Sequence, residues 1–347
     1  MTLSYFFCII FNMYYGNKKQ FMLDIIEKIK KSGLRGRSGS GFLTGLKWEM
    51  VKNAPGTKKY VICNAAEGDP NIFKDGFILR NYPEEVIKGI EIALKVIKSK
   101  ESYIYLRKDY FQKYKQLLEK IIKRRKLSTK LFKKPGGYIS GEETVLIRAI
   151  EGKSLEPRKK PPYPTTDGLF NLPTLINNIE TFYFVPQIVD GRYKKTRFYS
   201  LGGEIKNSGV YELSEDLTIE TILKMTGNWP RFKFFVQVGG TTGEILLENE
   251  LKQKTRGLGG IIVYSFNKTD PFILMNKWID FFRQENCDKC MSCREGVYRL
   301  KEILTPSKFD NKIFNDLVFI LEKTSFCPLG KNISLPFKSL IKKIING

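Results

Sequence analysis

The 347-residue sequence contains no histidine, and this absence removes several classes of active site. A Ser-His-Asp triad, a histidine general base, a histidine-ligated zinc and a histidine-ligated haem are all excluded. The sequence also lacks an apolar run of membrane-spanning length, since the apolar stretch Met1–Tyr15 is too short to cross a bilayer. It has neither the basic start nor the small-residue cleavage site of a secretory signal, so we expect it to pack on the body of the protein. Any chemistry must use carboxylates, cysteines or a bound cofactor.

The six cysteines are unevenly distributed. Cys287, Cys290 and Cys293 form a C-x₂-C-x₂-C run, Cys327 follows after 33 intervening residues, and the other two are isolated. A disulfide framework is not expected without a secretory signal, and zinc sites usually pair two C-x₂-C hooks or add histidine. Three thiolates at steps of three residues can hold one side of an iron–sulfur cubane while a distant cysteine ligates the fourth iron. The spacing therefore predicts a [4Fe–4S] cluster.

The chain is strongly basic, with 59 lysine and arginine residues against 36 acidic ones and a net charge of +23. These basic residues are spread along the whole sequence, and runs such as 123–126 and 158–160 are short. Nucleic-acid binding would more typically produce a contiguous basic patch. We interpret the charge as solvated helix faces that attract anionic ligands and acidic partner subunits.

Apolar periodicity divides the chain into three predicted domains, at 1–194, 195–268 and 269–347. In the first domain strand patterns alternate with amphipathic helices, which predicts an α/β fold with a largely parallel sheet. The expected helices cover 21–31, 83–97 and 111–121, and the expected strands cover 59–63 and 102–106.

The other two domains have different patterns. Two strands, a short helix and further strands in the second domain suggest a small α+β module of β-grasp type, with strands at 197–199, 210–213, 234–238 and 261–264 and the helix at 219–225. The third domain is helical, at 273–283, 293–304, 314–321 and 335–345. It predicts a helical bundle that carries the cluster ligands in its loops.

A glycine-rich loop follows the first predicted helix, with glycines at 33, 36, 39, 41 and 45. Glycine lets backbone N–H groups turn toward an anion and lets a phosphate approach closely. The spacing matches neither a Walker A loop nor G-x-G-x-x-G, so a flexible turn and a phosphate cradle are equally good interpretations. Lys47 lies just beyond, where a helix could begin, and could add a charge.

Three further segments carry polar groups at element ends. Asn64–Pro70 follows a predicted strand, at the edge where open α/β sheets bind ligands. Glu142 and Glu143 stand at a glycine-rich loop-to-helix junction, where compensation of the helix dipole alone would justify them. The basic, proline-rich segment 158–164 could be a surface linker. Beside an iron–sulfur site, these segments together indicate a nucleotide-handling electron-transfer protein.

Six motifs make the combination recognisable. They are Gly33–Arg37 through Thr44–Trp48, Cys63–Pro70 with Phe73–Asp75, Ser140–Thr144, Pro157–Pro164, Asn177–Thr181 and Cys287–Gly296. In this order they closely resemble motifs of the NADH-binding, FMN-containing flavoprotein component of respiratory complex I (the family of F subunits of NADH:quinone oxidoreductase), and the resemblance runs from about residue 20 to the C-terminal helices. The resemblance implies a Rossmann-like FMN and NADH domain, a β-grasp domain of the SLBB, ubiquitin-like kind, and a helical domain that binds a [4Fe–4S] cluster.

The resemblance also implies roles for individual residues. The FMN site would comprise Gly36, Ser38, Gly39, Gly41, Lys47, Asn64, Glu67, Tyr138, Gly141, Asn177 and Asn178. NADH would meet Phe42, Asp69, Lys160 and Tyr163, with Glu67 close to the NADH side. As the catalytic pair, Glu142 and Glu143 would hold the nicotinamide and its ribose against the flavin. Cys287, Cys290, Cys293 and Cys327 would ligate the cluster, which receives single electrons after hydride transfer from NADH to FMN.

The sequence departs from the family pattern at five positions. Ala66 stands where an aspartate is usual, which implies one polar contact fewer to the flavin. Ser38 replaces a glycine of the phosphate loop, Asp69 is shorter than the usual glutamate, and Met50 replaces an aromatic residue. Ser140 replaces a cysteine that is not a cluster ligand, so little should follow from that change.

The implied function is electron entry into NADH:quinone oxidoreductase. Partners would be a small [2Fe–2S] subunit and a large multi-cluster iron–sulfur subunit, with the chain peripheral on the cytoplasmic face of the inner membrane and without a membrane span. One alternative is the diaphorase subunit of an NAD-linked hydrogenase or formate dehydrogenase, whose members usually carry extra ferredoxin-like domains. A basic nucleic-acid-binding protein with a structural iron–sulfur site would leave the six motifs unexplained, so no nucleic acid is expected.

Overall fold

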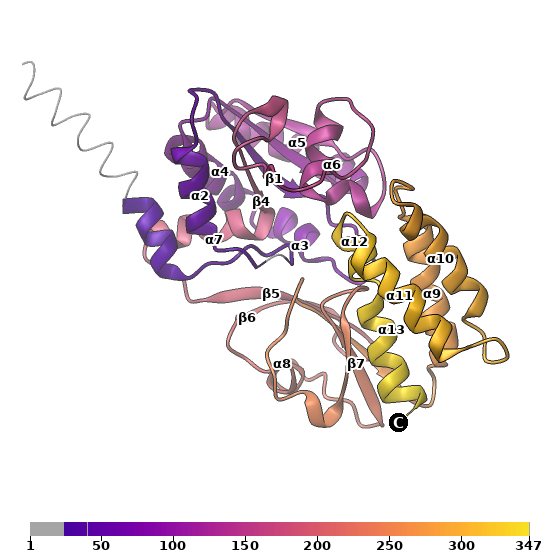
Figure 1. Cartoon of the computed structure of the whole chain (residues 1–347). Helices are drawn as coiled ribbons and strands as arrows, with labels where there is room; N and C mark the ends of the chain where they lie inside the picture. Colours follow the sequence, from indigo (N-terminus) through magenta and orange to yellow (C-terminus); the bar gives the residue numbers. More distant parts are fainter. Residues whose placement is uncertain (1–23, 40, 347) are drawn as a thin grey trace, which may run out of the picture.

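The computed structural model describes residues 24–39 and 41–346. The predicted packing of Met1–Tyr15 lies outside these residues. Two β-sheets and a layer of helices make up the described chain, with the first sheet and its helices above the second sheet and the C-terminal helices beside both (Figure 1). Of the helix expected over 21–31, the described part is helical from 24 to 32.

The first sheet is parallel throughout, as expected for an α/β domain, with strand order β3-β2-β1-β4. Its strands are β1 (Tyr60–Ala65), β2 (Glu101–Leu106), β3 (Thr129–Lys133) and β4 (Thr174–Asn178). The predicted strands at 59–63 and 102–106 correspond to β1 and β2. Its helices are α2 (Thr44–Asn53), α3 (Lys74–Asn81), α4 (Pro83–Ile97), α5 (Lys108–Arg124), α6 (Glu143–Ile150) and α7 (Ile179–Val189), with 3₁₀ turns η1 (Tyr138–Gly141) and η2 (Leu169–Asn171).

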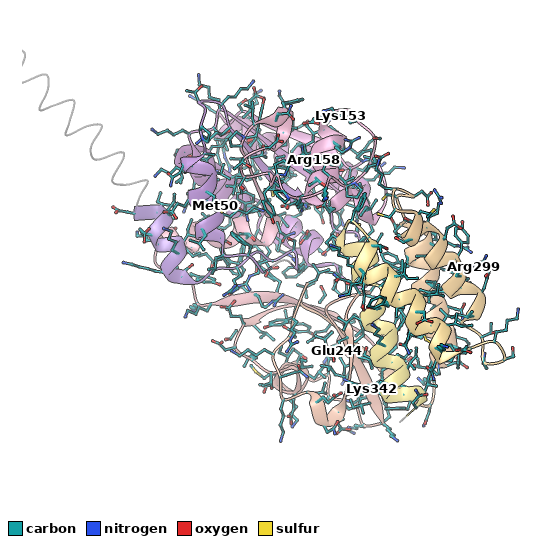
Figure 2. All side chains as sticks on the ribbon, viewed as in Figure 1. Met50, Lys153, Arg158, Glu244, Arg299 and Lys342 are labelled. Carbon is teal, nitrogen blue, oxygen red and sulfur yellow. The ribbon has the colours of Figure 1, made fainter. Side chains whose placement is uncertain are left out.

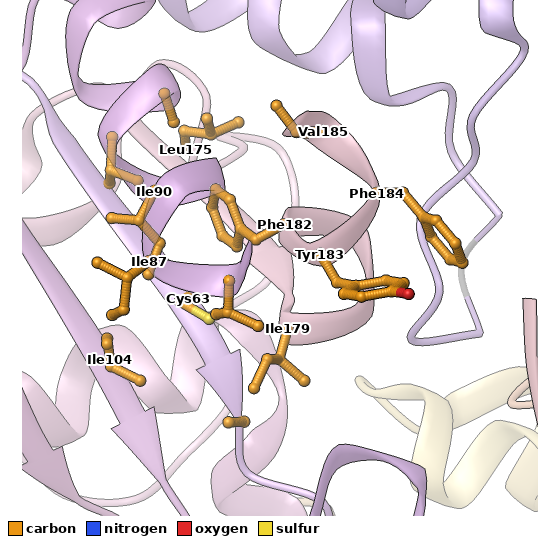
Figure 3. Close-up of a cluster of buried hydrophobic side chains, with 14 of the residues drawn as sticks. Cys63, Ile87, Ile90, Ile104, Leu175, Ile179, Phe182, Tyr183, Phe184 and Val185 are labelled. Atoms are coloured by element: carbon orange, nitrogen blue, oxygen red, sulfur yellow. The ribbon is translucent and has the colours of Figure 1, made fainter. Parts of the chain in front are cut away.

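The core of this part lies where α4 and α7 cover the sheet. Cys63, Ile87, Ile104 and Phe182 are fully buried there and lie close together (Figure 3). The α4 and α7 backbones approach closely, because a Cβ added at Gly89 would overlap the Phe182 carbonyl. Each fully buried apolar side chain of this size stabilises the folded state by roughly 1.5–3 kcal/mol. The packed layer therefore holds the strands in place, including the strand ends that carry polar residues.

The second sheet is mixed, with order β6-β5-β9-β7-β8 and a parallel β5–β9 pair between antiparallel neighbours. Its elements are β5 (Thr196–Gly203), β6 (Gly209–Ser214), α8 (Ile219–Met225), β7 (Phe234–Val238), β8 (Glu244–Leu247), η3 (Glu248–Glu250) and β9 (Gly260–Ser265). The four strands expected from the sequence correspond to β5, β6, β7 and β9. Strand β8 is an addition.

The C-terminal layer consists of α9 (Pro271–Gln284), α10 (Met291–Ile303), α11 (Asn311–Thr324), α12 (Pro328–Lys331), α13 (Ser334–Leu340) and the π-helix η4 (Ile341–Ile345). It is attached to the second sheet, where the backbone N–H of Ile245 donates to Ser339 Oγ (2.9 Å). In the part of the chain that the structure describes, every helix is too short or too polar to cross a membrane.

Candidate functional site

Polar side chains gather at the carboxyl ends of β1 and β4. The register pairs Cys63 with Asn177 and Asn64 with Asn178. The chain reaches β2 on one side of β1 and β4 on the other, so this is the point where the strand order reverses. Open α/β sheets bind ligands in the crevice at such a point, and Asn64 closes it from one side by donating to the Gly141 carbonyl (2.9 Å).

A cavity of about 980 Å³, which we call the main cavity, opens at this edge. Its walls come from the first sheet, the second sheet and the segment 328–335. Met50 of α2 and Glu244 of β8, both labelled in Figure 2, contribute to its lining. Ligand pockets usually measure roughly 300–1,000 Å³, so the cavity has room for a large ligand or for two. A smaller pocket of about 200 Å³ shares Ser38, Asn64 and Tyr138 with it.

Most residues expected at the site line one of these two spaces. Those in the main cavity are Ser38, Gly39, Phe42, Lys47, Asn64, Tyr138, Gly141, Glu142, Glu143, Lys160, Tyr163, Asn177 and Asn178. Glu67 and Asp69 line the smaller pocket. Gly36 and Gly41 line neither; the Gly36 N–H donates to the Phe42 carbonyl (2.8 Å) and closes the glycine-rich loop.

The loop delivers Lys47 to the cavity from the first turn of α2. That helix begins at Thr44, three residues earlier than the sequence suggested. Gly41 has φ +63°, a conformation that L side chains rarely adopt. The Lys47 ammonium reaches Glu143 Oε2 (3.2 Å).

Glu142 and Glu143 both bind Lys160, at 2.9 and 2.7 Å. Glu142 also caps α6 by accepting from the backbone N–H groups of Thr144 and Val145 (2.8 and 3.1 Å), so helix capping explains part of its position. Burial alone would raise the pKa of Glu143, but Lys47 and Lys160 outweigh it and lower that pKa to about 2. Two carboxylates and two ammonium groups thus line one wall of the cavity.

The two asparagines after β4 have different environments. Trp48 Nε1–H donates to Asn177 Oδ1 (2.9 Å) and fixes that side chain at the cavity wall. Asn178 Oδ1 accepts from Lys74 Nζ (3.2 Å), and its Nδ2 donates to Asp75 (3.0 Å). Asn178 is therefore held by buried charges, whereas Asn177 is oriented by an indole.

Glu67 lines the smaller pocket and is partly buried. It accepts from the Tyr110 hydroxyl (2.6 Å) and from the backbone N–H of Asp75 (3.1 Å). Burial, followed by the nearby Asp75 carboxylate, raises the pKa of Glu67 to about 8, although Lys74 opposes the shift. A carboxyl group that stays protonated at neutral pH therefore lines this pocket.

Stability should depend on pH through Glu67. Between about pH 4.5 and 8 the unfolded chain releases this proton while the folded chain keeps it, so rising pH favours unfolding through this group. Glu67→Gln cannot ionise, and we expect the variant to gain stability over the native chain across this window, by up to about 1.4 kcal/mol per pH unit. Denaturant unfolding of the ligand-free protein at pH 5, 6, 7 and 8 measures this difference in the free energy of unfolding. Parallel stability curves for the two proteins would contradict the raised pKa.

Asp69 connects the two sheets. Its carboxylate accepts from the backbone N–H and the hydroxyl of Thr241 (2.7 and 3.0 Å) and from the Asn71 N–H (2.9 Å). Gly240 has φ +91°, and a Cβ there would meet the same carboxylate. Asp69 thus lines the smaller pocket with its oxygen atoms already bonded to protein donors.

The four cysteines expected to bind the cluster converge between α9, α10 and α12. Cys290, Cys293 and Cys327 are buried and Cys287 is half-buried. The Phe326 N–H donates to Cys290 Sγ (3.3 Å). Burial, then Cys327, Cys290 and Cys287 as neighbouring thiols, raises the pKa of Cys293 to about 12. Among the described residues no three Cys, Asp or Glu side chains surround a single ion position; in a cubane each thiolate binds a different iron.

Sequence reasoning missed the walls contributed by the second sheet and by α12–α13. These residues include Gly239, Thr242, Lys254, Arg256, Leu258, Pro328 and Asn332. The signal that was present is the run Gly239–Gly243, whose glycines permit the close approach to Asp69. Nothing in the local pattern indicates that this run faces a strand end about 170 residues earlier.

Comparisons with known proteins agree with this geometry. Residues 29–187 match the family described as "Nuo51 FMN-binding domain". Residues 274–345 match the "NADH-ubiquinone oxidoreductase-F iron-sulfur binding region". The first range contains the glycine-rich loop and both asparagines, and the second contains all four converging cysteines.

Whole-chain relatives extend the likeness. The chain is 30% identical to an NADH-quinone oxidoreductase F subunit of Rhizobium meliloti, over 92% of this chain and 86% of that protein. It is 33% identical to the NADH-quinone oxidoreductase F subunit of Buchnera aphidicola subsp. Schizaphis graminum, over 95% and 86%. A crystal structure of an NAD⁺-reducing [NiFe]-hydrogenase superimposes with a TM-score of 0.85 at 27% identity, covering 92% of this chain and 61% of that chain.

Proposed function

We propose that this chain, which belongs to the family of NADH-quinone oxidoreductase F subunits, is the subunit through which electrons from NADH enter that enzyme. It binds FMN and a [4Fe–4S] cluster, as its two matched regions indicate. When bound, FMN accepts a hydride from NADH and the cluster carries single electrons onward. The observation that carries the proposal is the main cavity, which joins the strand ends of the first sheet to the segment that follows Cys327.

The cavity residues fit a phosphorylated flavin. Ser38, Gly39 and Lys47 offer a hydroxyl, a permissive backbone and an ammonium to a phosphate. Asn64 and Asn177 line the same cavity with amide groups that protein contacts already orient. Asn178 acts through position, because its amide is engaged by Lys74 and Asp75. No side-chain acid or base is required by hydride transfer, which suits a site without histidine.

Other residues of the same cavity fit NADH. Phe42 and Tyr163 are half-exposed rings on its lining and offer stacking faces. Lys160 can meet a phosphate, while Glu142 and Glu143 accept hydrogen bonds from sugar hydroxyls or the carboxamide. Since both carboxylates bind Lys160 in this structure, NADH would exchange some of those ion pairs for its own contacts.

The four thiols fit an iron–sulfur cluster. Two of the cysteines begin helices: Cys290 precedes α10 and Cys327 precedes α12. Helix N-termini stabilise negative charge, so both thiolates gain support when they ligate iron. Buried, sulfur-only donors without histidine are the chemistry that iron–sulfur clusters require.

The proposal is tested by the visible spectrum of the purified full-length chain. Flavin absorption that bleaches when NADH is added, followed by an electron paramagnetic resonance signal of a reduced cubane, is the expected result. A colourless, iron-free protein that shifts labelled DNA would contradict the proposal and favour the nucleic-acid alternative.

We also assign domain boundaries to the architecture. The division at 1–194, 195–268 and 269–347 places the cuts next to β5 and α9, which begin at Thr196 and Pro271. A Rossmann-like domain is supported by the parallel sheet. A β-grasp (SLBB-like) domain is supported by the mixed sheet with α8, and a helical cluster-binding domain by α9–α13.

Electrons must leave the chain from the cluster, so partner subunits should dock near the cysteine loops. Met291 and Phe326 flank the cysteine loops and are exposed, which suits a docking site for the large multi-cluster subunit, with a small [2Fe–2S] subunit in the same assembly. We place the assembly peripherally on the cytoplasmic face of the inner membrane.

A hydrogenase diaphorase role is the second candidate, because a solved NAD⁺-reducing hydrogenase superimposes closely. Co-purification distinguishes them: quinone-linked subunits support the first, a hydrogenase subunit the second.

A further inference from the structure

A single carboxylate joins the cavity to the cysteine loop. Glu285 lies at the C-terminal end of α9, two residues before Cys287, and accepts a hydrogen bond from the backbone N–H of Tyr138. Tyr138 begins the 3₁₀ turn Tyr138–Gly141, which lines the main cavity. The first N–H groups of a helical turn have no partner within the turn, so this carboxylate supplies an acceptor that the turn lacks.

The contact is built into the sequence at Gly137. A Cβ added there would overlap the Glu285 carboxylate group. The backbone of Gly137 does not itself require glycine, since its φ is −80°. Glycine at position 137 is therefore explained by the space that the Glu285 carboxylate occupies.

Two further contacts support the same junction. The rings of Tyr138 and Phe281 pack edge to face with centroids 5.3 Å apart, and Phe281 lies one helical turn before Glu285 on α9. The Lys134 ammonium is buried and donates to the Ala66 carbonyl (3.0 Å). Burial lowers the pKa of Lys134 to about 8, and the Glu285 carboxylate is the charge that most strongly opposes this shift. The turn is thus held by α9 on one side and connected to the Ala66 loop on the other.

We propose that Glu285 is a positioning residue that fixes the cavity-lining turn Tyr138–Gly141 to the end of α9, and so sets the spacing between the nucleotide cavity and the cysteine loop. The inference rests on the proposed function and deepens it. Hydrogen bonds to charged groups are among the stronger ones in proteins. A misplacement of about 1 Å at a reacting site can cost about 10²-fold in rate, so one such bond at this junction has a large effect.

Four variants of the full-length chain test the proposal: Glu285→Ala, Glu285→Gln, Gly137→Ala and, as the control, Glu156→Ala. Glu156 also bridges to the cysteine loop, through Lys289 at 2.9 Å, but at the surface. The readouts are hydrogen–deuterium exchange at the Tyr138 amide, FMN affinity measured by flavin fluorescence, and iron content. Stopped-flow then compares flavin reduction by NADH with reduction of the cluster.

In Glu285→Ala we expect exchange at Tyr138 to rise about tenfold or more, FMN to bind more weakly, and cluster reduction to slow more than flavin reduction. Glu285→Gln keeps an amide oxygen for the Tyr138 N–H and should stay close to the native chain. Gly137→Ala should reproduce the Glu285→Ala result with the carboxylate present, because its methyl group occupies the carboxylate position. Glu156→Ala should change none of these quantities.

Unchanged exchange and unchanged FMN affinity in both Glu285→Ala and Gly137→Ala would overturn the proposal. So would equal damage by Glu156→Ala. If Glu285→Ala does not fold, Gly137→Ala against Glu285→Gln still decides the question. If the native chain showed no flavin absorption, or none that NADH bleaches, that result would contradict the proposed function. The exchange data at the Tyr138 amide would still test the role of Glu285.

Discussion

Replacing Cys327 with serine is expected to remove the [4Fe–4S] cluster while leaving the flavin reaction in place. Serine is a hard oxygen donor, and iron–sulfur clusters are held by thiolates. Cys327 is buried and is the only cysteine that follows Cys293 in the sequence, so no second thiol of that segment can take its place. We expect iron content and the reduced-cluster resonance signal to fall to background. Electron delivery to quinone should fall at least about 100-fold, because the second half of the path is lost.

The matched control is Cys63→Ala. Cys63 is fully buried in β1, among the apolar side chains of the first sheet. Its loss should lower the free energy of unfolding by roughly 1 kcal/mol and leave the iron content unchanged. NADH oxidation by a soluble one-electron acceptor reports the flavin site, and it should survive in both variants. A Cys327→Ser protein with full iron content and a native signal would contradict the ligand assignment.

Local sequence patterns predicted β1, β2 and α4, but not β3 and β4. The residues from Tyr60 to Cys63 in β1 form an apolar run, and the structure buries them. Buried strands of a parallel sheet typically have such continuous apolar runs, so the local pattern predicted this strand. Strand β4 ends in Asn177 and Asn178, whose buried side chains are satisfied by hydrogen bonds to Trp48 and Asp75. Polar residues of this kind read as loop, since the partners that offset the cost of their burial lie far away in sequence.

The candidate site likewise contains residues that the sequence predicted and contacts that it did not. The motifs identified Lys47, Glu143 and Lys160, and the structure brings these three together. The motifs did not indicate that Asp69 is bonded to Thr241, or that Glu285 holds the cavity-lining turn. These contacts join the first sheet's part of the chain to the second sheet and to α9, so their geometry depends on how the layers pack, which no local spacing encodes.

We expect loss of the Glu180 carboxylate to be among the most destabilising single changes in the chain. Its side chain is fully buried and binds Lys74 Nζ (2.8 Å), and it also accepts from the Phe198 N–H (2.9 Å). Burial would raise the pKa of Glu180, but Lys74, Arg37 and Arg197 outweigh burial and lower it. The carboxylate therefore stays charged, and its removal leaves buried cations short of a partner.

We expect Glu180→Ala to reduce the free energy of unfolding by about 3–5 kcal/mol, the usual loss when one partner of a buried ion pair is removed. Asp190→Ala is the matched control: its pair with Lys88 is 2.9 Å long but leaves the side chains 34% and 35% exposed, so the loss should be about 0–1 kcal/mol. Denaturant unfolding measures both. Because Lys74 also binds Asn178, Glu180→Ala should release FMN more readily than Asp190→Ala. Equal losses in the two variants would show that the buried charges are not what supports this edge of the sheet.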